Sequence, residues 1–468
     1  MNLREWSEKQ GEQQKKHTAV MYMAEDGLKT ISWESFLEDV ERTIGIMEER
    51  KGQRICLLGE NSYVYLVCFL AVIGSGNTAV PLNRDLETAL LAQQIEEAEG
   101  VLILADKENM EKGKKLPIPC ADMKEIIEKG GKGIRKPILS IPGEKEACIL
   151  FSSGTGGRSK AVILSQENLM ESLIPAKPNA GGGILLCMPL HHIGGIKTAL
   201  HEFDGGQYLC ICPNMKCFFP VIHAMRPVSM LLVPSMLEML INRGRKNSQV
   251  ADYLKNHLER IYCVGAFLRP ELEEACTEFG IEVYNCYGLT ETAGPVTDHE
   301  SSKKGTVGRI APWNQVKIVD EEILVKGRNV ACGYLGDQDG EIQEEDGWFH
   351  TGDLGEIDPE GFLFLKGRKK NIIILENGEN VNPEELEREL SKCSLVKETL
   401  VYEEEGKICA EIYCGTLTGE EKVAYEGRVS EFINRMNRSL PMYRRIRTIK
   451  FRDTEFEKTS SMKLKRRK

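Results

Sequence analysis

The fold is decided by the stretch Ile149-Leu150-Phe151-Ser152-Ser153-Gly154-Thr155-Gly156-Gly157-Arg158-Ser159-Lys160-Ala161. An apolar run passes directly into small hydroxyl residues and glycines and ends at a lysine. Glycines let the backbone approach an anion closely, and lysine adds a positive point charge that suits phosphate. We therefore interpret this stretch as a buried strand followed by a phosphate-binding loop, with a plain surface turn as the alternative.

This loop is not the phosphate loop of P-loop NTPases. That motif ends in Gly-Lys-Ser/Thr and opens a helix. Here Ser159 precedes the lysine, Ala161 follows it, and residues 162–164 form a strand-like apolar run. The P-loop interpretation therefore fails at three points.

Short apolar runs alternate with helical patterns on both sides of this loop. Such alternation predicts parallel sheets covered by helices. The expected strands are 54–59, 78–82, 100–105, 229–233, 260–264 and 282–284, and the expected helices are 64–73, 87–98 and 270–279.

The pattern changes after about residue 305, where short strands at 316–319, 322–325 and 361–365 predict a compact β unit. Beyond 367–370, roughly a hundred residues carry a mixed pattern of their own, which is enough for a small domain. We therefore predict an α/β fold in two domains. Residues 1–369 form a large N-terminal domain of parallel-type sheets with helices plus the β unit, and residues 370–468 form a small α+β domain.

The composition is that of a globular protein with an acidic balance. The chain has 468 residues, 61 Lys+Arg and 71 Asp+Glu, for a formal net charge of −10. Because phosphate backbones recruit positive surfaces, we expect no nucleic-acid partner. No apolar stretch reaches the roughly 18 residues of a membrane span, and the N-terminus lacks the apolar core of a secretory signal. We expect no integral membrane segment and a cytoplasmic location.

The fifteen cysteines are scattered without a Cys-x-x-Cys pair, which favours buried thiols. The densest group of metal-ligand residue types matches no standard zinc spacing, so a zinc site is disfavoured. This group is Cys210, Cys212, Cys217, His191, His192 and His201.

A second motif follows an expected strand and reads Tyr284-Asn285-Cys286-Tyr287-Gly288-Leu289-Thr290-Glu291-Thr292. The aromatic ring of Tyr287 suits stacking on a base. Thr290 suits a phosphate oxygen, and Glu291 suits Mg²⁺, which prefers oxygen ligands. A strand-end Tyr-Gly turn is common, so this motif alone is a weak signal.

Two more motifs follow in the β unit and after it. In residues 346–355, a tight glycine-flanked turn presents Asp353, whose carboxylate can take both hydroxyls of a ribose. The alternative is a β-turn stabilised by the aspartate. Residues 367–371 and 378–387 read as a basic turn followed by a helix start, and taken alone they favour a solvated turn.

Taken together, the four motifs in this order and spacing resemble the adenylate-forming superfamily, which includes acyl-CoA synthetases, firefly-type luciferases and the adenylation domains of peptide synthetases. The resemblance covers the chain from about Ser32 to its end. It implies ATP, Mg²⁺ and coenzyme A as cofactors and a small-molecule carboxylic acid as substrate. It also implies that the C-terminal domain is mobile.

The resemblance also implies roles for individual residues. Tyr287 and Gly288 would lie beside the base, Thr290 would touch the α-phosphate, and Glu291 would hold Mg²⁺. Asp353 and Arg368 would bind the ribose hydroxyls, Lys370 would be the domain hinge, and His192 would gate the carboxylate. Lys463 would be the lysine that acts in adenylation. The phosphate loop would use Ser152, Ser153, Gly154, Thr155, Gly156 and Lys160, and Gly265 and Ala266 would lie against adenine.

The sequence departs from the family pattern in the phosphate loop, which reads Thr155-Gly156-Gly157 where two hydroxyl residues are usual and Ser159-Lys160-Ala161 where Pro-Lys-Gly is usual. It also departs at Met462, where glycine is usual. These changes affect the expected efficiency more than the reaction class. Amino-acid-activating relatives carry an aspartate after the position of His192, and residues 193–197 contain none. An acid without an α-amine is favoured as the substrate. The sequences of residues 368–371 and 377–380 resemble those of fatty-acyl-activating members.

We therefore expect an AMP-forming acyl-CoA synthetase. In its first step a carboxylic acid and ATP would give acyl-adenylate and pyrophosphate, and in its second step the thiol of coenzyme A would take the acyl group. Two alternatives stay open. The first is an enzyme whose acceptor is the phosphopantetheine of an acyl carrier protein, and the second is a degenerate nucleotide-binding protein.

Overall fold

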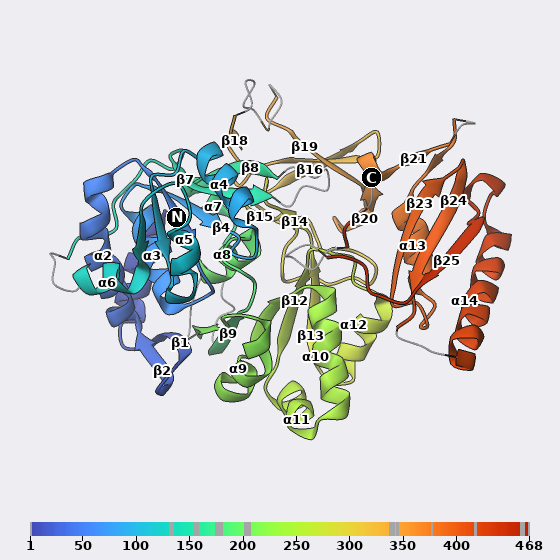
Figure 1. Cartoon of the computed structure of the whole chain (residues 1–468), viewed down its shortest axis with the longest axis horizontal. Coiled ribbons are helices and arrows are strands. Elements are labelled where there is room, and N and C mark those ends of the chain that lie inside the picture. The colour runs from blue at the N-terminus through green and yellow to red at the C-terminus, as the bar shows by residue number, and fades with distance from the viewer. Residues whose placement is uncertain are drawn as a thin grey trace.

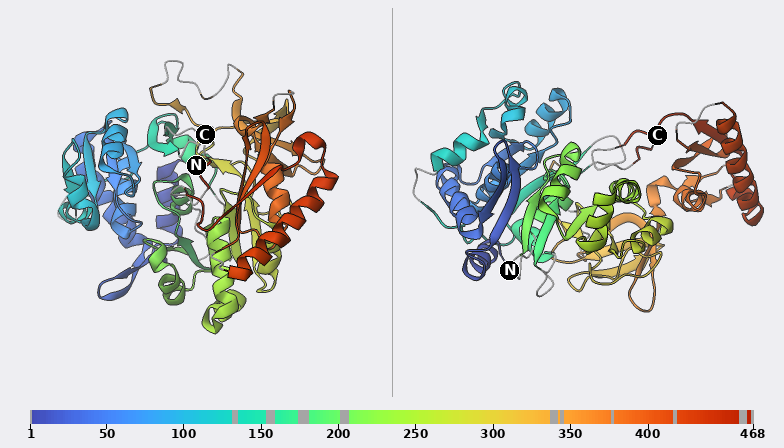
Figure 2. Two further views of the ribbon diagram at one scale, coloured as in Figure 1. Left: turned by 45° about the vertical axis from the view of Figure 1, so that its right-hand side comes forward. Right: turned by 90° about the horizontal axis from the view of Figure 1, so that it is seen from below.

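Two large sheets with helices, a small antiparallel sheet and a C-terminal body make up the chain (Figure 1). The computed structural model describes residues 2–130, 135–152, 159–173, 181–200, 207–336, 342, 346–375, 378–415, 419–458 and 464–466. Seen from below, the C-terminal body lies at the end of the molecule opposite to the N-terminal sheet (Figure 2).

The first sheet carries the expected phosphate loop. Its elements are β3 (Arg54–Leu58), α3 (Tyr63–Gly74), β4 (Thr78–Leu82), α4 (Thr88–Glu97), β5 (Leu102–Ala105), α5 (Met110–Gly113), β6 (Cys120–Asp122), α6 (Met123–Gly130), β7 (Glu146–Ser152), β8 (Lys160–Ser165) and β18 (Gly333–Tyr334). The strand order is β18-β8-β7-β4-β3-β5-β6, and β8 alone among these strands runs antiparallel to its neighbours, β7 and β18. Helix α3 is buried on nearly every side. The hydroxyl of Ser62 caps its N-terminus by accepting a hydrogen bond from the backbone amide of Tyr65.

The second sheet has the order β13-β12-β11-β9-β10-β1-β2 and is parallel except for β2. The strand β1, near one edge of this sheet, comes from the N-terminal segment of the chain and pairs with β10, with Val20 opposite Leu209. The sequence pattern did not predict this strand. The elements are α1 (Leu3–Gln13), β1 (Thr18–Ala24), β2 (Gly27–Ser32), α2 (Trp33–Met47), α7 (Gln166–Glu171), β9 (Gly182–Leu186), α8 (Ile193–Ala199), β10 (Gln207–Ile211), α9 (Phe218–Met225), β11 (Ser229–Leu232), α10 (Pro234–Lys246), α11 (Ser248–Asn256), β12 (Arg260–Val264), α12 (Pro270–Thr277) and β13 (Glu282–Cys286).

The β unit is an antiparallel sheet in the order β16-β17-β19-β20, next to a short hairpin, β14-β15. One expectation was wrong here. Asp353 lies within the strand β19 and not in a turn, because its neighbours pair with β17 on one side and β20 on the other. The elements are β14 (Gly288–Leu289), β15 (Gly294–Pro295), β16 (Gln315–Val319), β17 (Glu322–Lys326), β19 (Phe349–Ile357) and β20 (Leu363–Arg368).

The C-terminal body has a sheet and an apolar core of its own, built around Val381, Leu386 and Ile433. It contacts the β unit where Arg388 donates to the carbonyls of Leu365 and Lys366. Its elements are β21 (Ile373–Ile374), β22 (Asn380–Val381), α13 (Pro383–Ser391), β23 (Glu398–Glu404), β24 (Lys407–Tyr413), α14 (Gly419–Ser439) and β25 (Thr448–Arg452). Short 3-10 turns lie at η1 (Glu48–Arg50), η2 (Lys107–Asn109), η3 (Met215–Cys217), η4 (Lys369–Asn371) and η5 (Met442–Arg444).

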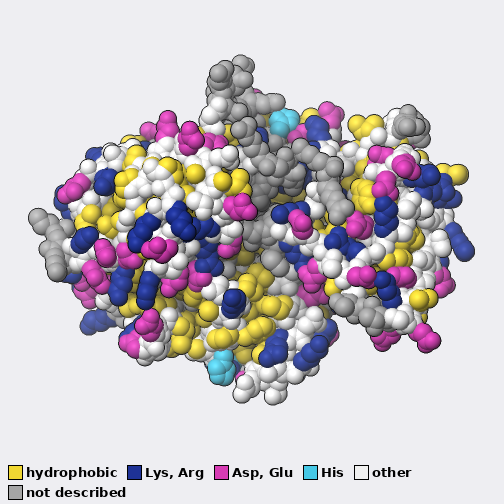
Figure 3. Space-filling view, viewed as in Figure 1, with side chains coloured by type: hydrophobic (Ala, Val, Ile, Leu, Met, Phe, Trp, Pro, Cys, Tyr) yellow, Lys and Arg dark blue, Asp and Glu magenta, His cyan; other side chains and the backbone are white. Residues whose placement is uncertain are grey.

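The predicted α/β fold class, with a large N-terminal part and a small C-terminal domain, is confirmed. The boundary at residue 370 stays a prediction. On the face shown in Figure 3, basic and acidic side chains are interspersed. Within the described ranges, no helix is both long and apolar enough to cross a membrane.

Candidate active site

The strands β12 and β13 end side by side and place two predicted segments at one sheet edge. They run parallel, with Val264 opposite Cys286, so Gly265 and Tyr287 emerge together. Gly265 has a φ of +87°, a conformation that side chains disfavour. Gly265 and Ala266 are exposed, whereas Tyr287 is buried. The structure therefore brings together the two segments expected to face adenine.

The turn between β14 and β15 presents Thr290 and Glu291. A Cβ at Gly288 would lie 2.2 Å from the carbonyl oxygen of Gly294, so only glycine fits there. The buried hydroxyl of Thr292 donates to the same carbonyl at 2.7 Å. These contacts fix the turn and leave Thr290 and Glu291 half-buried.

Tyr287, Asp353 and Arg368 form a chain of contacts. The hydroxyl of Tyr287 donates to Asp353 Oδ2 at 2.6 Å, and Arg368 Nε lies 2.5 Å from Asp353 Oδ1. Asp353 and Arg368 also face each other across β19 and β20. Burial, and next the nearby carboxylate, raise the pKa of Tyr287 far above its ordinary value, so the phenol stays a donor. Residues from three distant sequence motifs therefore meet at one carboxylate.

Tyr334 connects Glu291 to Lys160, and the sequence motifs missed it. Its hydroxyl lies 3.2 Å from Glu291 Oε1, and Lys160 Nζ lies 4.0 Å from the centre of its ring. The second contact has the geometry of a cation–π interaction. The strand β18 brings Tyr334 here by pairing with β8. A lone Gly-Tyr pair in a loop-like segment offered only a weak signal.

The ends of the predicted phosphate loop lie side by side. Ser152 pairs with Lys160 across β7 and β8, and its hydroxyl donates to the Lys160 carbonyl at 3.3 Å. The loop residues Ser153, Gly154, Thr155 and Gly156 lie outside the described residues, as does Lys463. Their roles stay predictions.

Lys370, the predicted hinge, lies in η4 directly after β20. Partial burial, and next the charge of Arg368, lower its pKa, while Asp353 and Glu291 oppose this effect. Lys370 is thus within electrostatic reach of the Asp353 carboxylate and the Glu291 turn. Its role as a hinge stays a prediction.

The two adjacent histidines differ in their surroundings. His192 is half-buried and is the residue that precedes α8, whereas His191 is buried. Their ring centres lie 4.3 Å apart. Burial, and next the charges of His192 and Arg84, lower the pKa of His191 well below its ordinary value, so His191 stays neutral. His192 is the better placed of the two to meet a ligand.

The cysteines near these histidines are buried free thiols at Cys210 and Cys212, with Cys217 partly exposed. Burial raises the pKa of Cys210 and of Cys212 to about 12. Among the described residues, no cluster of three or more His, Cys, Asp or Glu side chains could hold a metal ion. His201 lies outside that part of the chain.

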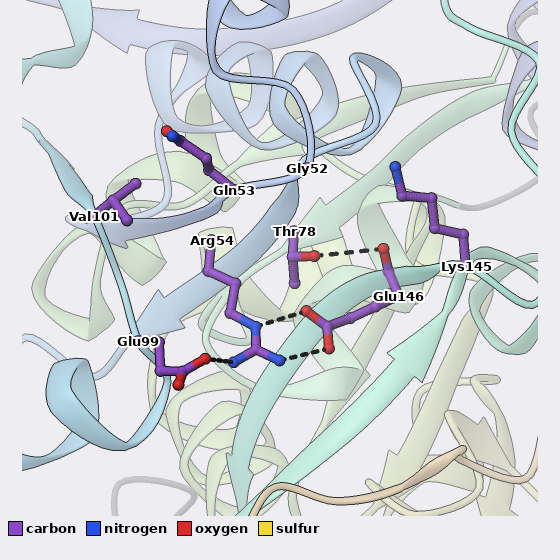
Figure 4. A pocket seen from close by; sticks show the side chains of 8 residues that line it. All are labelled: Gly52, Gln53, Arg54, Thr78, Glu99, Val101, Lys145 and Glu146. Atoms are coloured by element: carbon purple, nitrogen blue, oxygen red, sulfur yellow. Dashed lines mark hydrogen bonds and ion pairs between the residues drawn. The ribbon is translucent and has the colours of Figure 1, made fainter.

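A surface pocket of about 480 Å³ lies elsewhere, at the amino ends of the first sheet's strands (Figure 4). Within it, Arg54 makes a two-pronged contact with Glu146 at 2.9 and 3.1 Å and also meets Glu99. Lys145 donates to the carbonyl of Gly76. The charged groups pair with one another, and the phosphate loop is at the opposite end of β7.

The residues at the carboxyl edge fit ATP and magnesium. Asp353 and Arg368 are a buried acceptor and a fork of donors suited to ribose hydroxyls, and Gly265 leaves an exposed backbone at the strand end next to that of Tyr287. Mg²⁺ in nucleotide sites is held by one or two carboxylates together with the phosphates. A single carboxylate such as that of Glu291 is therefore enough.

The fold is that of an adenylate-forming enzyme, as the matches to two family models show. The chain matches the family model described as AMP-binding enzyme over residues 7–335, and the model of the AMP-binding enzyme C-terminal domain over residues 370–468. It belongs to the AMP-binding enzyme family. The resemblance read from the four motifs is confirmed.

Several relatives and solved structures are similar over most of the chain. The 2-succinylbenzoate–CoA ligase of Bacillus cytotoxicus is 30% identical over 377 residues, covering 76% of each chain. That of Bacillus cereus is 29% identical over 382 residues, covering 76% of this chain and 77% of the relative. The o-succinylbenzoate CoA synthetase of Bacillus subtilis, solved with an acyl-adenylate, has a TM-score of 0.81 at 22% identity and covers 100% of this chain and 98% of its own. ATP-bound MatB of Rhodopseudomonas palustris has a TM-score of 0.84 at 21% identity, with coverage of 99% and 97%.

Proposed function

We propose that this protein is an AMP-forming acid–thiol ligase that activates a carboxylic acid with ATP and passes the acyl group to coenzyme A. The observation that carries the proposal is the Tyr287–Asp353–Arg368 chain beside the Thr290–Glu291 turn. A carboxylate suited to ribose, held by Tyr287, and a carboxylate suited to Mg²⁺, four residues after Tyr287, suit a nucleotide whose α-phosphate faces the Thr290–Glu291 turn.

In the first step, a carboxylate oxygen of the acid attacks the α-phosphorus of ATP, and the bond to the β-phosphate oxygen breaks. The products are acyl-adenylate and pyrophosphate. Thr290 would donate to the α-phosphate, Lys160 would offset the charge of the departing phosphates, and Glu291 would hold Mg²⁺, whose chemistry is to neutralise phosphate oxygens. His192 would stand beside the attacking carboxylate.

Lys463 would supply a further cation in this step. A carboxylate that attacks a phosphate brings several negative charges together, and a placed ammonium stabilises the transition state. The C-terminal domain would then rotate about Lys370 and withdraw Lys463. In the second step the thiol sulfur attacks the acyl carbon, the thiol proton leaves, and AMP departs.

The relatives do not support a fatty acid as the substrate. The curated proteins similar to this chain are named 2-succinylbenzoate–CoA ligases, and that compound is an aromatic keto diacid. Their names also specify coenzyme A, whereas a carrier protein has no such support. We therefore propose coenzyme A as the acceptor and an acid without an α-amine, with 2-succinylbenzoate as the first candidate.

The test is acid-dependent exchange of labelled pyrophosphate into ATP, followed by thioester formation with coenzyme A. The panel should include 2-succinylbenzoate, hexanoate, decanoate and benzoate, with alanine as a control that carries an α-amine. We expect exchange with at least one acid and none with alanine. Absence of exchange with every acid would contradict the proposal and favour a nucleotide-binding protein without catalysis.

A further inference from the structure

Lys197 is a buried lysine directly behind the Thr290–Glu291 turn. It lies on α8, five residues after His192, and its side chain is 2% exposed. A Cβ built on Gly294 would lie 3.1 Å from its Cγ and 3.3 Å from its Cε. The lysine stem therefore packs on the residue that closes the turn, and α8 contacts β15 in the centre of the molecule (Figure 1).

The ammonium of Lys197 has backbone partners and, among the described residues, no ion pair with a carboxylate. It donates to the carbonyl of Leu169 and, at 3.5 Å, to that of Asn168. The acid whose charge acts on the pKa of Lys197 is Glu171, which itself pairs with Arg328 at 2.9 Å. An ammonium has three donors, and the described residues account for two of them. Burial lowers the pKa of Lys197 to about 7, and the charge of Glu171 opposes this effect.

His299 adds a second buried nitrogen donor near Lys197. Its Nδ1 lies 3.2 Å from Cys286 Sγ, and burial keeps that thiol protonated by raising its pKa well above the ordinary value. The thiol therefore donates to Nδ1, and the ring proton is assigned to Nε2. His299 is 5% exposed, and its Nε2 has no hydrogen-bond partner within the described part of the chain. Burial, and next the charge of Lys197, lower its pKa to about 4.

Both donors adjoin the candidate active site, and Lys197 shares α8 with the end at which His192 would meet the acid. Cys286 directly precedes Tyr287, and Gly294 follows the Thr290–Glu291 turn. If Lys197 only capped the carbonyls at the end of α7, two of its donors would be explained. That role does not account for a buried positive charge without a described counter-charge, nor for a His299 donor that has no partner among the described residues.

We propose that Lys197 and His299 form a subsite for a second acidic group at the far end of the substrate, so that the enzyme prefers dicarboxylic acids. A carboxylate there would accept from the ammonium and from His299 Nε2, and it would supply the missing counter-charge. The proposal rests on the proposed function, because it assumes that the other carboxylate is the one activated.

The experiment compares 2-succinylbenzoate with two analogues that each lack one carboxylate, 4-oxo-4-phenylbutanoate and 2-butanoylbenzoate. Wild type and Lys197→Met are assayed by pyrophosphate exchange and, independently of catalysis, by calorimetric binding of each acid. We expect wild type to prefer the diacid. Lys197→Met should lower kcat/KM and affinity for the diacid by roughly 10- to 100-fold, the loss typical of a hydrogen bond to a charged group, and change the values for an accepted monoacid only about twofold.

A second variant guards against misfolding and a third preserves the charge. His299→Phe should lower diacid affinity in the same direction, whereas Lys197→Arg should retain part of it. Equal affinity for diacid and monoacids in wild type, or an unchanged ratio in Lys197→Met, would overturn the subsite. If no acid supports exchange but diacid binding is still lost in Lys197→Met, the subsite stands and the proposed catalytic function fails.

Discussion

The hydroxyl of Tyr287 donates a hydrogen bond to the carboxylate of Asp353 across 2.6 Å, and both side chains are buried. Arg368 contacts the other oxygen of that carboxylate at 2.5 Å. The carboxylate is thus oriented from two sides before a nucleotide arrives. Preorganisation of this kind reduces the entropy lost on binding.

The first prediction concerns Tyr287→Phe, which keeps the ring and removes the donor. Because a hydrogen bond to a charged group contributes about 1.5–3 kcal/mol, kcat/KM for ATP should fall roughly 10- to 100-fold. The matched control is Tyr284→Phe, three residues earlier, whose hydroxyl meets Glu282 at 2.9 Å. ATP-dependent kinetics of both variants check this, and an unaltered KM for ATP in Tyr287→Phe would argue against a role for the pair in nucleotide binding.

The second prediction concerns Lys463→Ala. Removing one preorganised transition-state contact typically costs about 10²–10³ in rate, so pyrophosphate exchange should fall by that factor. Lys465→Ala is the control, because it removes a charge two residues away whose ion pair among the described residues is with Glu457 at 3.6 Å. Similar losses in both variants would indicate a general effect of tail charge.

The third prediction separates the two half-reactions. Proline fixes φ and lacks an amide proton, so Lys370→Pro should hinder rotation of the C-terminal domain. Pyrophosphate exchange should persist while thioester formation is largely lost. Lys370→Ala removes the charge without fixing the backbone and should retain both activities in larger measure. Equal loss of both half-reactions in the proline variant would speak against a hinge at this residue.

The fourth prediction concerns Arg466, which anchors the terminal segment. Its guanidinium lies 2.5 Å from Glu387 Oε2 and 3.4 Å from Glu384 Oε1 on α13. Because Lys463 is only three residues away, Arg466→Ala should lower pyrophosphate exchange, roughly tenfold by the value of a charged hydrogen bond. The backbones of Lys458 and Leu464 form an antiparallel β-bridge, which also holds the terminal segment. We therefore expect the domain to stay folded in Arg466→Ala. Full exchange activity in Arg466→Ala would show that this anchor is dispensable.

The fifth prediction is a pH dependence. With its pKa lowered to about 7 by burial, Lys197 is protonated below pH 7 and loses its charge as the pH rises through 7. The other groups that face it are the Leu169 and Asn168 carbonyls, Glu171 and the neutral His299. Calorimetric affinity for 2-succinylbenzoate should therefore fall between pH 7 and 9.

Two variants test that pH dependence. Lys197→Arg, which stays charged, should flatten it. Unfolding should show the linked effect: the folded pKa lies below the ordinary 10.5, so the unfolded chain binds more protons between about pH 7 and 10.5, and stability without ligand rises across that window. Lys197→Met should abolish this rise. A wild-type affinity that is constant from pH 6 to 9 would contradict the charged form as the binding form.

Local sequence patterns were enough for much of this site. The strands before Gly265 and Tyr287, the Thr290–Glu291 turn and the loop ends at Ser152 and Lys160 follow from apolar runs that end in glycines. Asp353 and Arg368 were both predicted at the ribose and the structure pairs them, but the turn predicted at Asp353 is a strand. This strand was missed because it mixes glycines and polar residues, and its pairing with β17 and β20 overrides local preference.

The sequence by itself determined the α/β class, the order of the motifs and the family, since these depend on periodicity and short spacings along the chain. Only the tertiary structure decided that Tyr334 joins Glu291 to Lys160, that Tyr287 holds Asp353, and that Lys197 and His299 lie buried without a described acid. Such contacts join residues tens to more than a hundred positions apart, and their burial and charge balance exist only once the sheets have packed.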